Sequence, residues 1–363
     1  MPGKRITGSP LVVQALLTRM CNLHCPYCSA QQLEEKEKEP EMTSRQWGDL
    51  LKKLKDIQVF EVDFSGGEIF LKEDVFEILA AAVHLKFPRM TIVTNGTLIT
   101  ETVARALREL KIRNIAVSLD GDREAHNQLR GEGSFERAMN GIGNLIQNGI
   151  IPSIQFTPLK TNIQRLANMT DLLYPMGIRR VSFNVLHPSG RARAIYRDIM
   201  LNCFQDAAGF QDTIERIRNE YNGIEIDNSF LAYQCYPEMY RHRSPSEEDG
   251  ARTLKPCSAA HTSCTITASG WVIPCAELFD FRGGNVIDHD ILDIWQNSEN
   301  FRQIRGLSDI PLSHVPHCRN CEYNVLCNAG CRADALTVYG DLLAPDPFCP
   351  YIKHRDVDEY LGR

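Results

Sequence analysis

The sequence predicts an α/β fold, a partial (β/α)6 TIM-like barrel followed by a small cysteine-rich C-terminal domain. Between residues 10 and 187, apolar strand-like runs alternate with amphipathic helical patterns. Such alternation is typical of parallel strands joined by right-handed crossovers. Downstream, eight of the 13 cysteines fall between Cys257 and Cys349, where regular periodicity is weak. Six strand–helix units favour an incomplete barrel over a closed eightfold one, and an open doubly wound sheet is the alternative.

The six expected strands are short apolar runs separated by helical patterns. The first helical pattern, residues 42–56, opens with Thr43 and Gln46 at the spacing of a capping box. Each helical pattern would form the crossover between two neighbouring parallel strands. Further helical patterns cover residues 72–87, 100–110, 134–149 and 162–177. The expected strands cover residues 11–17, 59–67, 90–96, 114–121, 152–159 and 180–187.

Composition and charge restrict the class of protein. Hydrophobic residues make up 43% of the 363 positions and charged residues 24%, which is the balance of a globular protein with a large core. The net charge of −6 argues against nucleic acid as the main partner, because binding phosphates needs a basic excess. The apolar run at residues 11–17 is too short for a signal peptide or a membrane span. We therefore expect a cytoplasmic protein that does not bind membranes.

Polar and glycine-rich clusters follow the ends of the expected strands. Residues 21–28 follow the first strand, "SGGE" the second, "TNG" the third, "SLDG" the fourth and "HPSGRA" the sixth. Barrels and open α/β sheets place their active sites at the carboxyl ends of parallel strands. We therefore expect these clusters to converge on one site.

Three cysteines, Cys21, Cys25 and Cys28, form a C-x3-C-x2-C pattern after the first strand. In a reducing compartment, clustered cysteines bind metal or do redox work more often than they form disulfides. Thiolates favour zinc or iron–sulfur clusters, and His24 leaves a zinc site with mixed ligands as an alternative. The interpretation we prefer is a cluster of four irons and four sulfurs with one iron open to an outside ligand.

This pattern, with Tyr27 before the third cysteine, resembles the radical S-adenosylmethionine (SAM) enzymes. The resemblance implies that SAM chelates the open iron. It implies further that one-electron reduction cleaves SAM to a 5′-deoxyadenosyl radical, which abstracts hydrogen from a substrate. Other positions match family elements that contact SAM. By resemblance these are Tyr27 in the cysteine motif, Ser65, Gly66, Gly67 and Glu68 at the methionine ammonium, Ser118 at the ribose, Arg130 at the carboxylate and Leu186 at the adenine.

Each of these SAM contacts has a plainer interpretation. The two glycines of "SGGE" fit a tight turn between a strand and a helix. Arg130 could form a surface salt bridge of little energetic weight. Leu186 could be an ordinary core leucine.

The C-terminal cysteines follow a second, longer pattern. Cys257 is followed by Gly270 and Cys275, and then by C-x2-C-x5-C-x3-C and a last cysteine. The pattern resembles the SPASM domain, a C-terminal extension of some radical SAM enzymes that holds auxiliary four-iron clusters. A pair of zinc ribbons is the alternative, and His314 and His317 flank the second group as competing ligands. The resemblance implies one cluster on Cys257, Cys264, Cys275 and Cys331, and another on Cys318, Cys321, Cys327 and Cys349, which makes three four-iron clusters in all.

The chain divides into three predicted parts. Residues 1–190 form the barrel, and residues 191–250 form a bridging segment with one helix near residues 206–222. Residues 251–363 form the auxiliary-cluster domain, which we expect to be held by metal more than by a core.

The residue after Cys275 bears on the reaction. Family members with this architecture mature sulfatases, modify ribosomally made peptides or act in cofactor pathways, including haem synthesis. The sulfatase-maturing members place an aspartate directly after the equivalent cysteine, as a base. Here that residue is Ala276, with Glu277 next. Glu277 is therefore our candidate catalytic base, and a surface glutamate that hydrogen-bonds its loop is the alternative.

We expect a peptide or protein maturase. The first strand begins near residue 11, which leaves no room for the leader-binding domain of many peptide-modifying members. We therefore expect a separate leader-binding protein or direct recognition, and a low-potential electron donor such as flavodoxin or ferredoxin. One alternative is a small-molecule oxidoreductase in haem-like or quinone cofactor synthesis. Another is a non-enzymatic iron–sulfur or zinc-binding adaptor, which does not explain why the motifs share one edge of the sheet.

Overall fold

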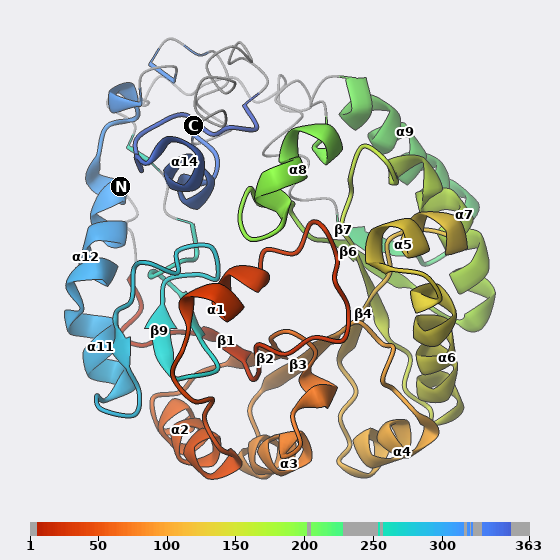
Figure 1. The fold of residues 1–363 in the computed structure, drawn as a ribbon, viewed down its shortest axis with the longest axis horizontal. Helices are drawn as coiled ribbons and strands as arrows, with labels where there is room; N and C mark the ends of the chain where they lie inside the picture. The colour runs from red at the N-terminus through yellow and green to blue at the C-terminus, as the bar shows by residue number, and fades with distance from the viewer. Residues whose placement is uncertain are drawn as a thin grey trace.

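The computed structural model describes residues 6–201, 205–227, 253–254, 257–315, 318–319, 321 and 329–349. Its centre is a ten-stranded sheet with the order β10-β9-β8-β1-β2-β3-β4-β5-β6-β7. Figure 1 shows this sheet as a curved inner layer with helices around its outer side. The strand order is linear, so the described part of the chain forms an incomplete barrel, as predicted.

The six strands expected from the sequence are present, and all are parallel. Neighbours in the chain are also neighbours in the sheet, which places the carboxyl ends of all six strands at one edge. The strands are β1 (Val12–Leu16), β2 (Glu61–Ser65), β3 (Arg89–Thr94), β4 (Ile115–Ser118), β5 (Ser153–Phe156) and β6 (Arg180–Phe183).

Four further strands extend the sheet beyond the prediction. β7 (Glu225–Asp227) pairs in parallel with β6, and β8 (Ser263–Ile266) pairs in parallel with β1. β9 (Trp271–Ile273) and β10 (Gly284–Asn285) add an antiparallel edge. One sheet therefore runs through all three predicted parts of the chain, and the limits of those parts stay a prediction.

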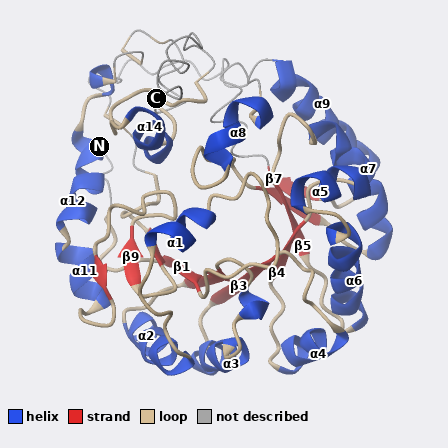
Figure 2. Ribbon diagram, in the orientation of Figure 1, coloured by secondary structure: helices blue, strands red, loops and turns tan. Residues whose placement is uncertain are grey.

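The outer layer consists of amphipathic helices (Figure 2). In α2 (Ser44–Asp56), Thr43 and Gln46 form the predicted capping box, and Trp47 and Leu51 are buried in the core that Val13 of β1 shares. The helix predicted near residues 206–222 is α9. Helices of this layer are α3 (Val75–Leu85), α4 (Glu101–Glu109), α6 (Ser134–Gln147), α7 (Leu166–Leu173), α9 (Gln205–Glu220), α11 (Ile291–Asn297) and α12 (Glu299–Gly306).

Shorter helices lie nearer the carboxyl ends of the strands. They are α1 (Gln31–Lys36), α5 (Arg123–Arg130) and α8 (Ala192–Ile199), which follow β1, β4 and β6, and α14 (Arg332–Tyr339) from the C-terminal part. Among the described residues, the model has no helix with the length and apolar character needed to cross a membrane.

Candidate active site

The three-cysteine segment follows β1 at the carboxyl edge of the sheet. Cys21, Cys25 and Cys28 are all free thiols. The Cys28 charge raises the pKa of both other thiols, although burial has the larger effect. The three thiols therefore lie near one another. Burial is the main reason that the pKa of Cys25 rises to about 11. A set of three clustered thiols, with no fourth among the described cysteines, fits a cluster that leaves one iron open.

The glycines of "SGGE" let the end of β2 approach the base of the cysteine segment. Gly66 has φ +145°, and a Cβ atom on it would lie 2.5 Å from the Thr18 carbonyl oxygen. A Cβ atom on Gly67 would lie 2.1 Å from the Met20 carbonyl oxygen. Instead, Gly67 N and Glu68 N donate hydrogen bonds to these two carbonyls, each at 2.7 Å. The turn therefore fixes the backbone that leads into Cys21, and Ser65 ends β2 beside it.

The Glu68 side chain is fully buried and joins the end of β2 to the end of β3. Its carboxylate accepts hydrogen bonds from Thr94 Oγ1 and Asn95 N, both at 2.7 Å. Burial raises the pKa of Glu68, although these donors oppose the shift. Asn95 in turn donates to Asn22 Oδ1 at 2.9 Å. The "TNG" cluster therefore holds the cysteine segment through Asn95, a role that the sequence did not reveal.

Tyr27, Asp120 and Arg130 form a buried group at the carboxyl ends of β1 and β4. Tyr27 Oη donates a hydrogen bond to Asp120 Oδ2, and Arg130 Nε donates to the same oxygen at 2.5 Å. Burial opposes the charge on Asp120, but Arg130 outweighs it and holds the pKa of Asp120 below its usual range. Thr157 N donates to the other carboxylate oxygen at 2.9 Å. Asp120 is thus the anchor of the group, and sequence reasoning gave it no role.

The plainer interpretation of Arg130 is wrong in one respect. Its ion pair with Asp120 is buried, with side-chain exposures of 9% and 0%, so it is no surface salt bridge. The two terminal nitrogens of Arg130 make no hydrogen bond with any residue that the structure describes. They remain available for the carboxylate of a ligand.

Ser118 and Leu186 lie at the same edge in different surroundings. Ser118 ends β4, is 8% exposed, and its hydroxyl has no hydrogen-bond partner among the described residues. Leu186 packs in an apolar cluster with Tyr27 and Cys25. Ser118 is therefore an open hydrogen-bonding position, whereas Leu186 already serves the local core.

The segment from His187 to Arg191, which follows β6, contacts both halves of the molecule. Arg191 donates from its backbone to Cys28 O at 3.1 Å and from Nε to Cys25 O at 2.9 Å. Ser189 Oγ donates to Glu277 Oε2, two residues after Cys275. His187 Nδ1 lies 2.8 Å from Asp334 Oδ1, three residues after Cys331. We call residues 187–191 the linking segment.

Charge accumulates where the linking segment meets the C-terminal part. Burial disfavours a charged His187 ring, but Asp334 and Glu277 outweigh it and raise its pKa to about 10. Burial, and then Asp334, raise the pKa of Asp346 to about 6. Glu277 is half-buried and faces this group through Ser189. The predicted base therefore lies at the mouth of the barrel, with a hydrogen-bond partner, and its catalytic role stays a prediction.

The auxiliary cysteines fall into two groups. Cys275 lies near both Cys257 and Cys331, because the Cys257 charge acts on Cys275 and the Cys275 charge acts on Cys331, after the larger effects of burial and of nearby carboxylates. Around Cys318, burial and then the charges of Cys349 and Cys321 raise its pKa to about 11. Cys327 and His317 lie outside the described residues, as do the isolated Cys203 and Cys235.

Among the described cysteines of the two predicted auxiliary sets, Cys264 alone lies apart from the other thiols. Burial raises its pKa to about 12, and the charge that acts on it is that of Arg305. It lies in β8 opposite Val13 of β1. The first predicted set is thus brought together with three members, not four.

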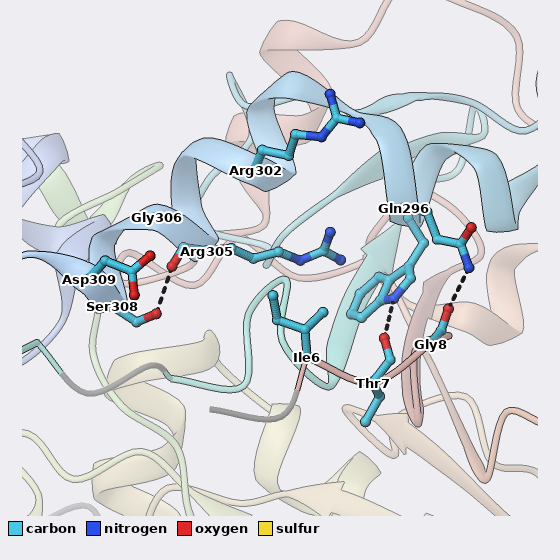
Figure 3. A pocket seen from close by; sticks show the side chains of 10 residues that line it. Ile6, Thr7, Gly8, Gln296, Arg302, Arg305, Gly306, Ser308 and Asp309 are labelled. Atoms are coloured by element: carbon cyan, nitrogen blue, oxygen red, sulfur yellow. Dashed lines mark hydrogen bonds between the residues drawn. The ribbon is translucent and has the colours of Figure 1, made fainter. Parts of the chain in front are cut away.

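A separate pocket of about 540 Å³ lies at α11, α12 and the first described residues. Figure 3 shows Arg305 extended across it, with Arg302 above and Ile6 below. None of the predicted site residues lines this pocket. The candidate active site therefore stays at the carboxyl edge of the sheet.

Comparisons with known proteins agree with this site. The radical SAM superfamily model matches residues 16–173, and the SPASM model, an iron–sulfur cluster-binding domain, matches residues 257–322. An AdoMet-dependent heme synthase of Nitratidesulfovibrio vulgaris is 30% identical over 96% of this chain and 95% of its own length. A PqqA peptide cyclase of Streptomyces rochei is 27% identical over 96% of this chain and 92% of its own length.

The fold matches solved structures as well. The crystal structure of SuiB from Streptococcus suis bound to S-adenosylmethionine has a TM-score of 0.73 at 21% identity, covering 94% of this chain and 77% of SuiB. Radical SAM and SPASM domains imply SAM binding and iron–sulfur clusters. The thiols of Cys21, Cys25 and Cys28 and the clustered C-terminal thiols fit such clusters. This chain belongs to the radical SAM superfamily and carries a SPASM iron–sulfur domain in its C-terminal part.

Proposed function

We propose that this enzyme cleaves SAM to a 5′-deoxyadenosyl radical and uses it to abstract hydrogen from a peptide or protein substrate. The observation that carries the proposal is the linking segment, which contacts Cys25, Cys28, Glu277 and Asp334 within five residues. It puts a SAM-type cysteine loop and the auxiliary thiols at one barrel mouth. When bound, the clusters would supply the electron that cleaves SAM and an acceptor for an electron from the substrate.

The protein's own residues would bind and orient SAM. Asp120 holds Arg130 by its Nε, which leaves the terminal nitrogens for the methionine carboxylate. The Ser118 hydroxyl, which has no partner among the described residues, suits a ribose hydroxyl. The "SGGE" turn would present its backbone to the methionine ammonium, with Glu68 fixed by Thr94 and Asn95. Glu277 would accept the proton that the substrate loses.

Three four-iron clusters are part of this proposal, one on the barrel loop and two in the C-terminal part. The peptide substrate is supported by relatives that include a PqqA peptide cyclase. A leader-binding protein and a flavodoxin or ferredoxin donor would be the partners.

A second candidate function is radical chemistry on a small tetrapyrrole. It is favoured by the 30% identity to an AdoMet-dependent heme synthase over 96% of this chain. The two candidates make different demands on the barrel mouth, because one substrate is a flexible chain and the other a flat, rigid ring.

An experiment on the anaerobic holoenzyme separates these candidates. The enzyme is mixed with Fe-coproporphyrin III, and the Soret band is followed for a saturable shift. In parallel, release of 5′-deoxyadenosine from SAM is measured with the porphyrin or with peptides encoded beside the gene. We expect a peptide to stimulate release and the porphyrin to leave it unchanged.

The reverse result would replace the peptide proposal with the tetrapyrrole one. Absence of SAM cleavage under every condition would contradict both. A Cys28→Ala variant is the matched control, since it should bind either substrate without cleaving SAM.

A further inference from the structure

We propose that Asp334, and not Cys264, is the fourth protein ligand of the auxiliary cluster held by Cys257, Cys275 and Cys331. The inference rests on the proposed function only in requiring that this cluster exists. It changes one predicted ligand from a thiolate in a strand to a carboxylate at the start of α14.

The first reason is the face of the sheet on which Cys264 lies. In the parallel pair of β1 and β8, Cys264 is opposite Val13 and Thr265 is opposite Gln14. Paired residues project from the same face, and the bond from Thr265 Oγ1 to Gln14 Oε1 at 3.1 Å confirms this for the second pair. Thr265 also pairs with Ile273 of β9, two residues before Cys275. Cys264 therefore shares the opposite face with Val13.

That opposite face is covered by the outer helices. Val13 and Cys264 belong to the main apolar core together with Trp295 and Phe301 of α11 and α12, whereas Leu16 and Ile273 of the other face form a separate small cluster with Phe279. The charged neighbour of the Cys264 thiol is Arg305 of α12, whose Nε donates to Ala260 O at 2.6 Å. Figure 3 shows Arg305 extending from α12 toward the outer pocket. Cys264 thus faces the helix layer, whereas Cys331 faces the linking segment at the barrel mouth.

The second reason is an unsatisfied carboxylate beside Cys331. Asp334 is 1% exposed, and its Oδ1 is paired with His187 at 2.8 Å. Its Oδ2 is buried and has no hydrogen-bond partner among the residues that the structure describes. A buried carboxylate oxygen left without a partner is costly. Ligand atoms of Asp334, His187 and Cys331 lie within 4.8 Å of one another, so iron bound by Cys331 would be within reach of this carboxylate.

The third reason is the balance of charge. Asp334 and Asp346 are both buried at this point, at 1% and 4% exposure. Asp346 accepts hydrogen bonds from Cys331 N and Phe348 N, both at 2.7 Å, whereas within the described part of the chain the Asp334 carboxylate is paired with His187 alone. Buried anions require cations or metal ions nearby. His187 already gives Asp334 one positive partner, and an iron of the cluster would give its second oxygen a direct contact with a metal ion. Binding of iron by a group other than a thiolate has precedent in clusters with histidine ligands.

The test compares substitutions at the two candidate ligands in the anaerobically reconstituted full chain. The readouts are iron per chain and the EPR spectrum of the reduced clusters, neither of which needs turnover. We expect wild type and Cys264→Ala to hold about twelve irons with the same spectrum, from three four-iron clusters. Asp334→Ala should hold about eight irons and lose one EPR component.

Two further variants separate ligation from folding. Asp334→Asn keeps an oxygen for His187 but is a poor iron ligand, so it should lose the same iron as Asp334→Ala although the contact with His187 is kept. Asp334→Cys should regain about twelve irons with altered g-values, because the ligand set becomes all-thiolate.

Loss of about four irons in Cys264→Ala, or full iron with an unchanged spectrum in both Asp334→Ala and Asp334→Asn, would overturn the assignment. The proposed function fails in a different way, by low iron or absent SAM cleavage in the wild type itself.

Discussion

The SAM side of the barrel mouth and the cysteine-rich side bury polar groups in different ways. On the side of the predicted SAM contacts, the Asp120 carboxylate accepts hydrogen bonds from Tyr27, Arg130 and Thr157. The Glu68 carboxylate accepts hydrogen bonds from Thr94 and Asn95. On the cysteine-rich side, Asp334 keeps a buried oxygen that has no partner in the described ranges, and the pKa of Asp346 is raised by burial and by Asp334. On the first side both buried carboxylates have protein partners for each oxygen, whereas on the second side one buried carboxylate oxygen has none among the described residues.

This difference indicates two ways of building a site in one chain. Protein contacts can form a ligand site before its ligand binds. Such a site requires that every buried polar group in the network has a hydrogen-bond partner. A metal-organised site takes its final form with the metal, because ligand binding and folding are then one process. Predictions that remove ligands or partners on each side test the comparison.

The largest effect should come from removing the barrel thiols. Cys21→Ala, Cys25→Ala and Cys28→Ala together should abolish release of 5′-deoxyadenosine and remove about four irons. The melting temperature should change little, because the surrounding network is made of protein groups. Calorimetry and product analysis measure these effects.

The matched variant carries Cys257→Ala, Cys275→Ala and Cys331→Ala. It should lose as much iron but unfold at a clearly lower temperature. Equal melting temperatures for the two triple variants would contradict the comparison.

The next largest effect should come from Asp120→Asn. The change leaves the buried Arg130 without its counter-charge, which costs about 3–5 kcal/mol in the free energy of unfolding. SAM binding should weaken as well, because Arg130 loses its anchor. Denaturant titration of the holoprotein and equilibrium binding of SAM provide the measurements.

The control for Asp120→Asn is Asp280→Asn, which breaks an exposed pair with Lys36 at 2.7 Å. It should cost at most about 1 kcal/mol. A similar cost at both positions would show that burial of the Asp120 pair is energetically unimportant.

A smaller effect is expected for Glu277→Gln. If Glu277 is the base, product formation should drop on the order of a hundredfold, the lower range for a general base. SAM cleavage and iron content should persist, since neither involves Glu277. Product yield and 5′-deoxyadenosine are measured in the same samples, with Asp280→Asn as the nearby control. Wild-type product yield would assign Glu277 a structural role through Ser189.

The sequence predicted the barrel well because its signals are local. Each of the six strands is a contiguous apolar run, and the motifs follow strand ends, so parallel topology alone brings them to one edge. The capping box of α2 was predictable for the same reason. β8 was missed because its pairing with β1 joins residues far apart in the chain.

The residues of the candidate site could be predicted from sequence motifs, but the residues that hold them by hydrogen bonds could not. Tyr27 and Arg130 stood in recognisable patterns, yet Asp120, which holds both, has only the "SLDG" context. The ligand role of Cys264 was predicted by counting cysteines, without the strand face that each one occupies, and it stays a prediction. Asp334 follows Cys331 at C-x2-D, a spacing that is a signal only once the cysteine is known to hold metal.

The pairing of β8 with β1 has a consequence for how the protein is made. β1 emerges early from the ribosome, but its neighbour on one side follows roughly 250 residues later, as the contact between Gln14 and Thr265 shows. At ordinary rates of synthesis this is a delay on the order of 10–50 seconds. During that time one edge of the nascent barrel offers unpaired backbone groups to other chains. A fragment that ends before Ser263 keeps that edge open permanently, so the N-terminal barrel should be aggregation-prone when expressed without the C-terminal part.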